Sequence, residues 1–344
     1  MFHYMRRGRA FYKDVVILAI PIILQNLVTT SLGLVDTLMV GMLGETPLAA
    51  VTTANMPVFV IQLVIFGLQS GSSVLISQYW GKGDRENINR VIGIGCYVAG
   101  AISILFALVM MAFPRPLMGL LVNDAALVEI AADYARIVGP SYILNSITGV
   151  YVGAHRSMEN PKLGLIIFSI SMCANTFLNW VLIFGNFGAP KLGVVGAAIA
   201  TVASRFVEVV ILIVYTSVKR DVFPSFKGAV SHLFKIEKPL FANIMKRGFP
   251  LFINETLWSL GMSGLAMCYS WRGLDVVSGY NIASTVINVF NIAYMALGNS
   301  VGIIVGKYLG AGEYEQAVDE DRKLIAFCVL IGLVMGIILL CTAG

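Results

Sequence analysis

The 344-residue chain is 58% hydrophobic and only 12% charged, with a mean hydropathy of +0.82 and a formal net charge of +5. Soluble domains carry about 25% charged residues, so this composition excludes a soluble protein and indicates an all-α polytopic membrane protein. The basic residues gather on one side of the predicted spans. The positive charge therefore reflects membrane topology, and we expect no nucleic-acid partner.

Nine apolar segments are long enough to cross a bilayer, for which about 20 residues suffice. They cover residues 15–40, 48–79, 91–113, 134–154, 163–186, 193–218, 243–270, 276–306 and 324–344. The second and eighth are longer than a bilayer needs, so we expect them to tilt or to project beyond it. Alternate connecting segments, together with the N-terminus, carry most of the lysines and arginines. The positive-inside rule then places the N-terminus in the cytoplasm of a multi-pass plasma-membrane protein.

An internal repeat appears when the chain is shifted by 229 residues, which places Pro21 on Pro250, Gly81 on Gly310 and Gly83 on Gly312. The first copy holds an even number of spans, so the two copies are parallel. We expect an N-terminal six-helix lobe (1–218), a cytoplasmic linker (219–242) and a partial C-terminal lobe of three helices (243–344). A complete second copy would need about three more spans, so we expect a truncated second lobe with about nine of twelve helices.

Four polar residues of the first lobe are predicted to share one depth in the membrane: Asp36, Asn175, Asn179 and Thr201. An unpaired carboxylate at mid-membrane costs at least about 2.5–3.5 kcal/mol, so it usually serves a cation or a proton. Carboxylate, amide and hydroxyl oxygens suit a hard monovalent cation. The alternative is that the two amides and the hydroxyl only join helices by hydrogen bonds.

Other polar residues inside the spans are assigned more modest roles. Glu255 in the seventh span is a candidate coupling acid of the second lobe, and the prolines at 21 and 250 are candidate helix bends. Arg205 and Glu208 are three residues apart and are predicted to form a structural ion pair. The segment 81–86, GKGDRE, lacks the phosphate-binding pattern and is predicted to be a helix stop and turn. The five cysteines lie in apolar runs without metal-ligand spacing, and no catalytic motif is visible, so we do not expect an enzyme.

Taken together, these motifs resemble the multidrug and toxic compound extrusion (MATE) family. The similarity rests on VDTLMVGMLG at 35–44, QYWGKGD at 78–84, NTFLNWVLIFG at 175–185, GVVGAAIATVASR at 193–205 and PLFINE at 250–255. The resemblance implies two helical lobes around a central cleft. It implies export of amphipathic, often cationic compounds in exchange for sodium ions or protons, with no other cofactor.

Within that resemblance, Asp36, Asn175, Asn179 and Thr201 match the positions that the family uses as a cation site, and Glu255 matches the acid of the seventh span. Some members carry a second aspartate where this chain has Asn179, so Asp36 is left as the main candidate switch. We expect either a sodium ion or a proton at Asp36 and no other metal. We also expect contacts with an amphipathic cation and membrane lipid, but no obligate protein partner. Two alternatives stay open, a flippase of lipid-linked oligosaccharides from the related superfamily and a non-transporting remnant.

Overall fold

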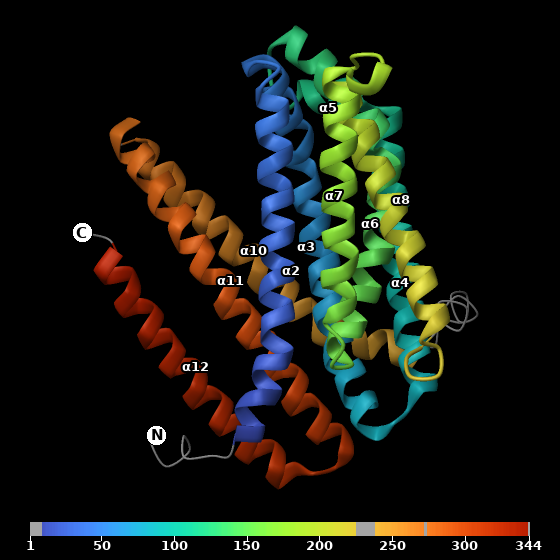
Figure 1. Cartoon of the computed structure of the whole chain (residues 1–344), viewed down its shortest axis with the longest axis vertical. Coiled ribbons are helices and arrows are strands. Elements are labelled where there is room, and N and C mark those ends of the chain that lie inside the picture. The colour runs from blue at the N-terminus through green and yellow to red at the C-terminus, as the bar shows by residue number, and fades with distance from the viewer. Residues whose placement is uncertain (1–8, 225–237, 272–273, 343–344) are drawn as a thin grey trace.

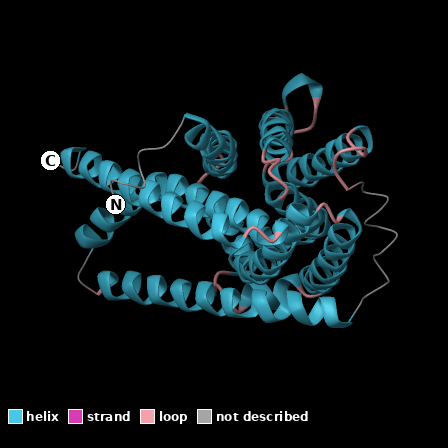
Figure 2. Ribbon diagram, turned by 90° about the horizontal axis from the view of Figure 1, so that it is seen from below, coloured by secondary structure: helices cyan, strands magenta, loops and turns pink. Residues whose placement is uncertain are grey.

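The computed structural model describes residues 9–224, 238–271 and 274–342, and every regular element within these ranges is a helix (Figures 1 and 2). The long helices are α2 (Arg9–Gly41), α3 (Glu45–Lys82), α4 (Arg85–Ala112), α6 (Ala125–Ser157), α7 (Lys162–Phe184), α8 (Val194–Val218), α10 (Lys238–Ser270), α11 (Leu274–Ala311) and α12 (Tyr314–Thr342). A short helix, α5 (Pro114–Gly119), and a 3-10 turn, Asn186–Gly188, join them. Each predicted span falls in one long helix, which confirms the all-α polytopic fold. Most of the predicted linker lies outside the described residues, and 238–242 begin α10.

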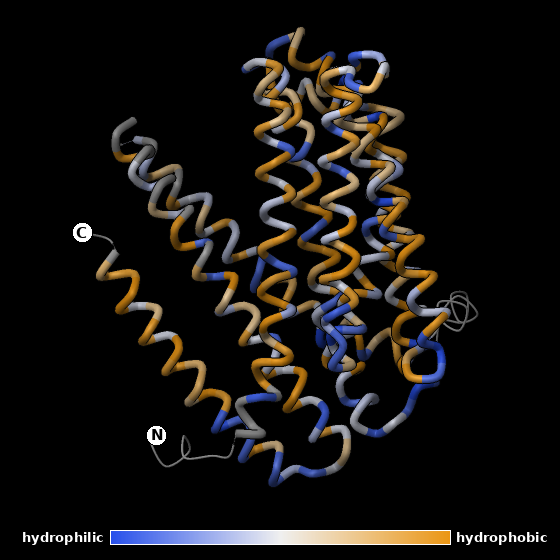
Figure 3. Tube along the Cα trace, viewed as in Figure 1, coloured by the Kyte–Doolittle hydropathy of each residue, from blue (hydrophilic) through white to orange (hydrophobic). Residues whose placement is uncertain are grey.

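Seven of the described helices are long and apolar enough to cross a membrane. The two long helices outside this set are α6 and α10. The first turns of α6 contain Glu129, Asp133 and Arg136, which lowers its overall hydropathy. Colouring by hydropathy shows apolar residues along the lengths of the helices and hydrophilic residues at the turns of the lower end (Figure 3).

The glycine-rich segment between α3 and α4 is a helix stop and turn, as predicted. Gly83 follows the last residue of α3 with a φ of 72°, a conformation that glycine adopts without strain. Asp84 then caps α4, because its side chain accepts a hydrogen bond of 3.1 Å from the backbone N–H of Asn87. At the equivalent turn between α11 and α12, Gly312 has a φ of 82°.

The internal repeat extends to the helix boundaries. A shift of 229 residues takes the last residue of α2 onto the last residue of α10 and the last residue of α3 onto the last residue of α11. The same shift takes the first residue of α4 onto the first residue of α12. The sequence repeat is therefore a structural repeat of at least two helices and the turn that follows them.

The two copies meet where α3 and α11 end, and their contacts are symmetric. A Cβ atom on Gly81 would lie 2.0 Å from the carbonyl oxygen of Lys307, and one on Gly310 would lie 1.9 Å from the carbonyl oxygen of Gln78. These two contacts exchange under the 229-residue shift. Only glycine allows the backbones to approach so closely. We call this end of the molecule the contact end.

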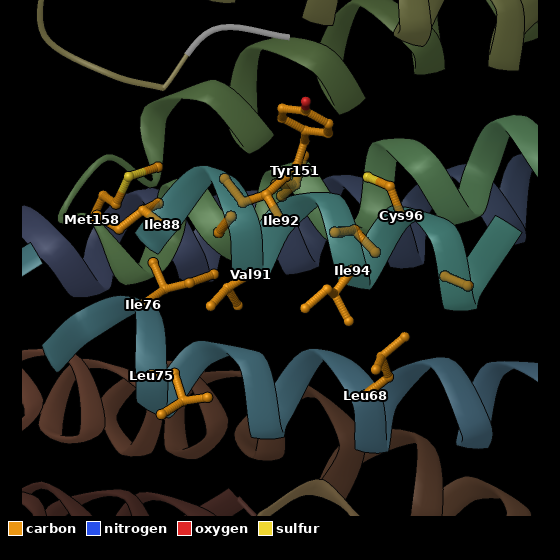
Figure 4. Packing of buried hydrophobic residues seen from close by; sticks show 14 of the residues in the cluster. Leu68, Leu75, Ile76, Ile88, Val91, Ile92, Ile94, Cys96, Tyr151 and Met158 are labelled. Carbon is orange, nitrogen blue, oxygen red and sulfur yellow. The ribbon is translucent and has the colours of Figure 1, made fainter. Parts of the chain in front are cut away.

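The apolar core of the first lobe lies between α3, α4, α6 and α7, and Figure 4 shows part of it. Leu240 and Ile244, near the start of α10, pack against the same cluster. On the other side, α2 packs through Val15 and Leu18 against Leu297 of α11 and Leu324 of α12. From these contacts α10, α11 and α12 diverge from the other helices toward the opposite end of the molecule (Figure 1).

An ion pair also joins the two copies at the contact end. Lys307 of α11 lies 2.9 and 2.8 Å from the two carboxylate oxygens of Glu159, in the turn between α6 and α7. The indole N–H of Trp80 donates a hydrogen bond of 3.3 Å to the same carboxylate. Glu159 has a φ of 59°, a conformation that is uncommon for residues other than glycine.

Candidate cation site

A row of polar side chains runs along the face of α7 that packs against α8. Ser171, Asn175 and Asn179 are four residues apart, so they share one face of the helix, and each is at most 1% exposed. Buried polar groups need partners, and α8 supplies two of them. The Ser171 hydroxyl donates to Glu208 Oε1 at 2.6 Å, and Asn175 Nδ2 donates to Ser204 Oγ at 3.5 Å.

Asp36 of α2 joins the upper end of this row. Asn179 Nδ2 donates one hydrogen bond to Asp36 Oδ1 and another, of 3.0 Å, to Asn175 Oδ1. Three of the four residues predicted as a cation site therefore form one connected group. Asn179 Oδ1 is buried and has no partner among the described residues. Leaving a buried acceptor unpaired costs about 1–3 kcal/mol, which a bound cation or water would offset.

A cavity of about 210 Å³ adjoins Asp36 at the end of the helices opposite the contact end. Its lining includes Asp36, Thr37, Asn55 and Tyr134, together with apolar side chains of α2, α3 and α8. The cavity is large enough for several water molecules or a partly hydrated ion.

Thr201, the fourth predicted ligand, meets this group through Tyr134. The Thr201 hydroxyl donates 3.0 Å to the carbonyl oxygen of Ala197, one turn earlier in α8. Tyr134 lines the same cavity as Asp36 and Asn55, and its hydroxyl lies within electrostatic reach of Thr201, Asn55 and Asp36. Tyr134 was not among the predicted site residues. Its position as a hydroxyl-bearing aromatic residue at the outer end of the fourth span was the available signal.

Replacing Tyr134 with phenylalanine is expected to destabilise the protein by about 0.5–1.5 kcal/mol, because the buried hydroxyl loses its polar interactions with the residues around Asp36. Thermal unfolding of the detergent-solubilised protein measures the change. Tyr142 on the same helix is the matched control, because its buried hydroxyl has no partner in the described structure. Tyr142→Phe should leave the unfolding temperature unchanged or raise it. An equal decrease in unfolding temperature in both variants would show that the Tyr134 hydroxyl does not stabilise the residues around Asp36.

The predicted ion pair between Arg205 and Glu208 is confirmed, with Arg205 Nη1 at 2.7 Å from Glu208 Oε1. The Glu208 side chain is fully buried, whereas the side chain of Arg205 is 22% exposed. The row of polar side chains on α7 is therefore bonded to two acids, to Asp36 at one end and to Glu208 at the other.

The remaining predicted residues lie apart from this group. Glu255 is half-buried on α10 and makes no side-chain hydrogen bond to another described residue. Pro21 lies within α2, which continues as one helix across it, and Pro250 is exposed within α10. Among the described residues, no three His, Cys, Asp or Glu side chains gather as they would around a divalent metal. The group around Asp36 offers one carboxylate and neutral oxygens, which fit a monovalent ion better.

The chain was compared with known protein families. A family model described as MatE matches residues 21–181 and 250–344, which is more than half of the chain. The chain belongs to the MatE family. The two matched segments begin at Pro21 and Pro250, which are 229 residues apart, and the resemblance seen in the sequence is confirmed. As a MatE protein, the chain is a membrane transporter and not an enzyme.

Two curated relatives of this MatE protein are multidrug resistance proteins. It is 28% identical over 335 residues to the probable multidrug resistance protein NorM of Thermotoga maritima, with 95% of this chain and 69% of that protein covered. It is 27% identical over 329 residues to the probable multidrug resistance protein YoeA of Bacillus subtilis, with 95% and 71% covered. These relatives support its assignment as a drug exporter.

Solved structures support the fold of this MatE protein. A crystal structure of MATE in the bent conformation superposes with a TM-score of 0.83 at 21% identity, covering 96% of this chain and 72% of that one. An outward-facing multidrug resistance MATE family transporter of the MOP superfamily gives a TM-score of 0.75 at 22% identity, with 96% and 71% covered.

Proposed function

We propose that this MatE protein exports amphipathic, cationic compounds across the plasma membrane in exchange for sodium ions or protons. One observation carries the proposal. Asp36 is a carboxylate within an apolar helix, bonded to Asn179 and open to a cavity of about 210 Å³. Acids inside membrane-spanning segments are costly and mark ion or proton pathways.

The contact end is proposed to face the cytoplasm, with the N-terminus on the same side. Lys82, Arg85, Lys307 and Arg322 lie at or near that end, whereas Arg115 and Lys191 lie at the other. Cytoplasmic loops carry the excess of lysine and arginine. In this orientation the two repeat copies meet at the cytoplasmic side, and the cavity beside Asp36 lies toward the outside.

In the proposed cycle, a cation entering from outside neutralises Asp36, and α2 then bends at Pro21. Proline lacks the N–H donor of a normal helical residue, so this position is a weak point of the helix. Two solved structures, described as MATE in the bent and in the straight conformation, superpose on this chain with TM-scores of 0.83 and 0.79, respectively. Bending is proposed to narrow the drug cavity and release the compound. Glu255 would provide an acid in the second lobe to attract the cationic compound or to take part in coupling.

Charge reversal at the contact end tests the proposed alternation. Breaking the pair between Glu159 and Lys307 by Glu159→Lys should raise cytoplasmic accessibility roughly 1.5- to 5-fold, since a partly exposed pair contributes about 0.2–1 kcal/mol. Labelling of an introduced cysteine at Ser77 by a membrane-impermeant thiol reagent measures this. The exchanged pair, Glu159→Lys with Lys307→Glu, should return the rate toward that of the parent. If the exchanged pair labels as fast as the single variant, the ion pair does not hold this end closed.

Transport by purified protein in proteoliposomes tests the function itself. We would follow a fluorescent organic cation and an uncharged analogue under a sodium gradient, a proton gradient or neither. The proposal predicts movement of the cation only under one of the two gradients, and loss of that movement in Glu255→Gln. A transport rate that is the same with and without the sodium and proton gradients would contradict the proposal. Preferred movement of a pyrophosphate-linked lipid would instead favour the flippase.

A further inference from the structure

Four residues of α8 form one face toward the Asp36 group. Thr201, Ser204, Arg205 and Glu208 follow the spacing of three and four residues that places side chains on the same side of a helix. Glu208, at the deep end of this face, accepts hydrogen bonds from Ser171 at 2.6 Å and from Arg205 at 2.7 Å, both at Oε1. Its second oxygen, Oε2, is buried without a partner in the described structure. The carboxylate is therefore desolvated and depends on Arg205 as its counter-charge.

Arg205 follows Ser204, and hydrogen bonds connect Ser204 through Asn175 and Asn179 to Asp36, so Arg205 lies within electrostatic reach of Asp36. One guanidinium thus stands near two carboxylates and is bonded to only one of them, Glu208. Asp36, Glu208 and Arg205 together carry one net negative charge when all are ionised. One monovalent cation neutralises the group as it stands. If Arg205 were released by Glu208, it could pair with Asp36 and make an external cation unnecessary.

We propose that Glu208 is a positioning residue for cation coupling: it holds Arg205 away from Asp36, so that Asp36 stays available to the sodium ion or proton that drives export. Arg205 is the internal competitor of that cation. This inference rests on the proposed function. It adds that the Arg205–Glu208 pair sets the affinity of the cation site. Neither residue needs to touch the cation, because each acts through the charge that Asp36 experiences.

Charge-neutral variants test the competition. The readout is the half-saturating concentration of whichever cation drives wild-type transport of a fluorescent organic cation in proteoliposomes. Glu208→Gln should raise that concentration at least about tenfold, because Arg205 is free to pair with Asp36. Arg205→Gln with Glu208→Gln keeps the net charge of the group and removes the competitor. This double variant should return to within about threefold of wild type.

Two further variants separate this role from a structural one. Glu129→Gln breaks a similar but solvent-exposed pair with Arg115, and should leave the cation dependence unchanged. Arg205→Gln alone tests the same competition without altering Glu208. It should lower the half-saturating concentration, because the competitor is lost, whereas a merely structural pair predicts weaker cation use.

The outcomes distinguish the inference from the function on which it rests. The role of Glu208 would be overturned if Glu208→Gln left the half-saturating cation concentration unchanged. It would also be overturned if the double variant raised that concentration as much as Glu208→Gln alone. A half-saturating concentration that rises in Arg205→Gln would also overturn the role of Glu208. This second test remains available if Glu208→Gln fails to insert into the membrane. Absence of gradient-driven transport by the wild-type protein would overturn the proposed function, and the inference with it.

Discussion

Replacing Asp36 with asparagine is expected to reduce gradient-driven export about 10- to 100-fold, the largest effect of any substitution in the first lobe. The change keeps the size of the side chain and removes its charge. An amide in this position can no longer attract a cation or release a proton, and hydrogen bonds to charged groups contribute about 1.5–3 kcal/mol. Initial rates of fluorescent-cation transport in proteoliposomes, at fixed gradient, measure the loss.

The matched control for this variant is Asp133→Asn, the same chemical change at an exposed aspartate of α6 next to Tyr134. It should transport at close to the wild-type rate. The Asp36 variant should also bind the exported compound with nearly unchanged affinity, since the lesion lies in coupling. Coupled export that survives in Asp36→Asn would exclude Asp36 as the switch.

Valine at Gly310 is expected to prevent the two repeat copies from closing at the contact end. A Cβ atom there would lie 1.9 Å from the carbonyl oxygen of Gln78, and backbone cannot give way as a flexible side chain can. Overpacking of this kind costs about 1–3 kcal/mol, so the open form at this end should gain roughly 5- to 150-fold in population. Faster labelling of a cysteine at Ser77, together with slower transport, would record the change.

Gly100→Val in α4 is the control for this steric effect. A Cβ atom at Gly100 meets nothing within 4 Å, so the variant carries the same loss of helix propensity without the clash. Its labelling and transport should stay close to wild type. If Gly310→Val also labels at the parental rate, the contact between α3 and α11 is not the closure that transport opens.

The helices and their turns could be predicted from the sequence because their causes are local. Long apolar runs determine the spans, and glycine at 83 and 312 permits the left-handed turns that end α3 and α11. The 229-residue repeat was also visible in the sequence, because it places Gly83 on Gly312 at the equivalent turn of the second copy. The symmetric approach of Gly81 and Gly310 was less accessible, because it depends on how two distant helices are placed.

Only part of the site followed from the sequence. Asp36, Asn175 and Asn179 were predicted together because their depth and spacing are properties of single helices, and the structure joins them by hydrogen bonds. Tyr134 was missed because it is the first residue of the predicted span. In the structure α6 begins nine residues earlier, at Ala125, so Tyr134 lies well inside the helix. The bond from Ser171 to Glu208 depends on the register between α7 and α8, which neither helix encodes alone.

The most direct test of the account is the dependence of drug affinity on the coupling cation. Exchange requires that the two ligands favour different conformations, so each must weaken binding of the other by the same factor. Fluorescence titration of an organic cation onto detergent-solubilised protein, at increasing sodium concentration and at increasing acidity, measures this factor. We expect one of the two cations to weaken drug binding by roughly 5- to 150-fold in the wild-type protein and not in Asp36→Asn. Drug affinity in the wild-type protein that is indifferent to both cations would contradict it.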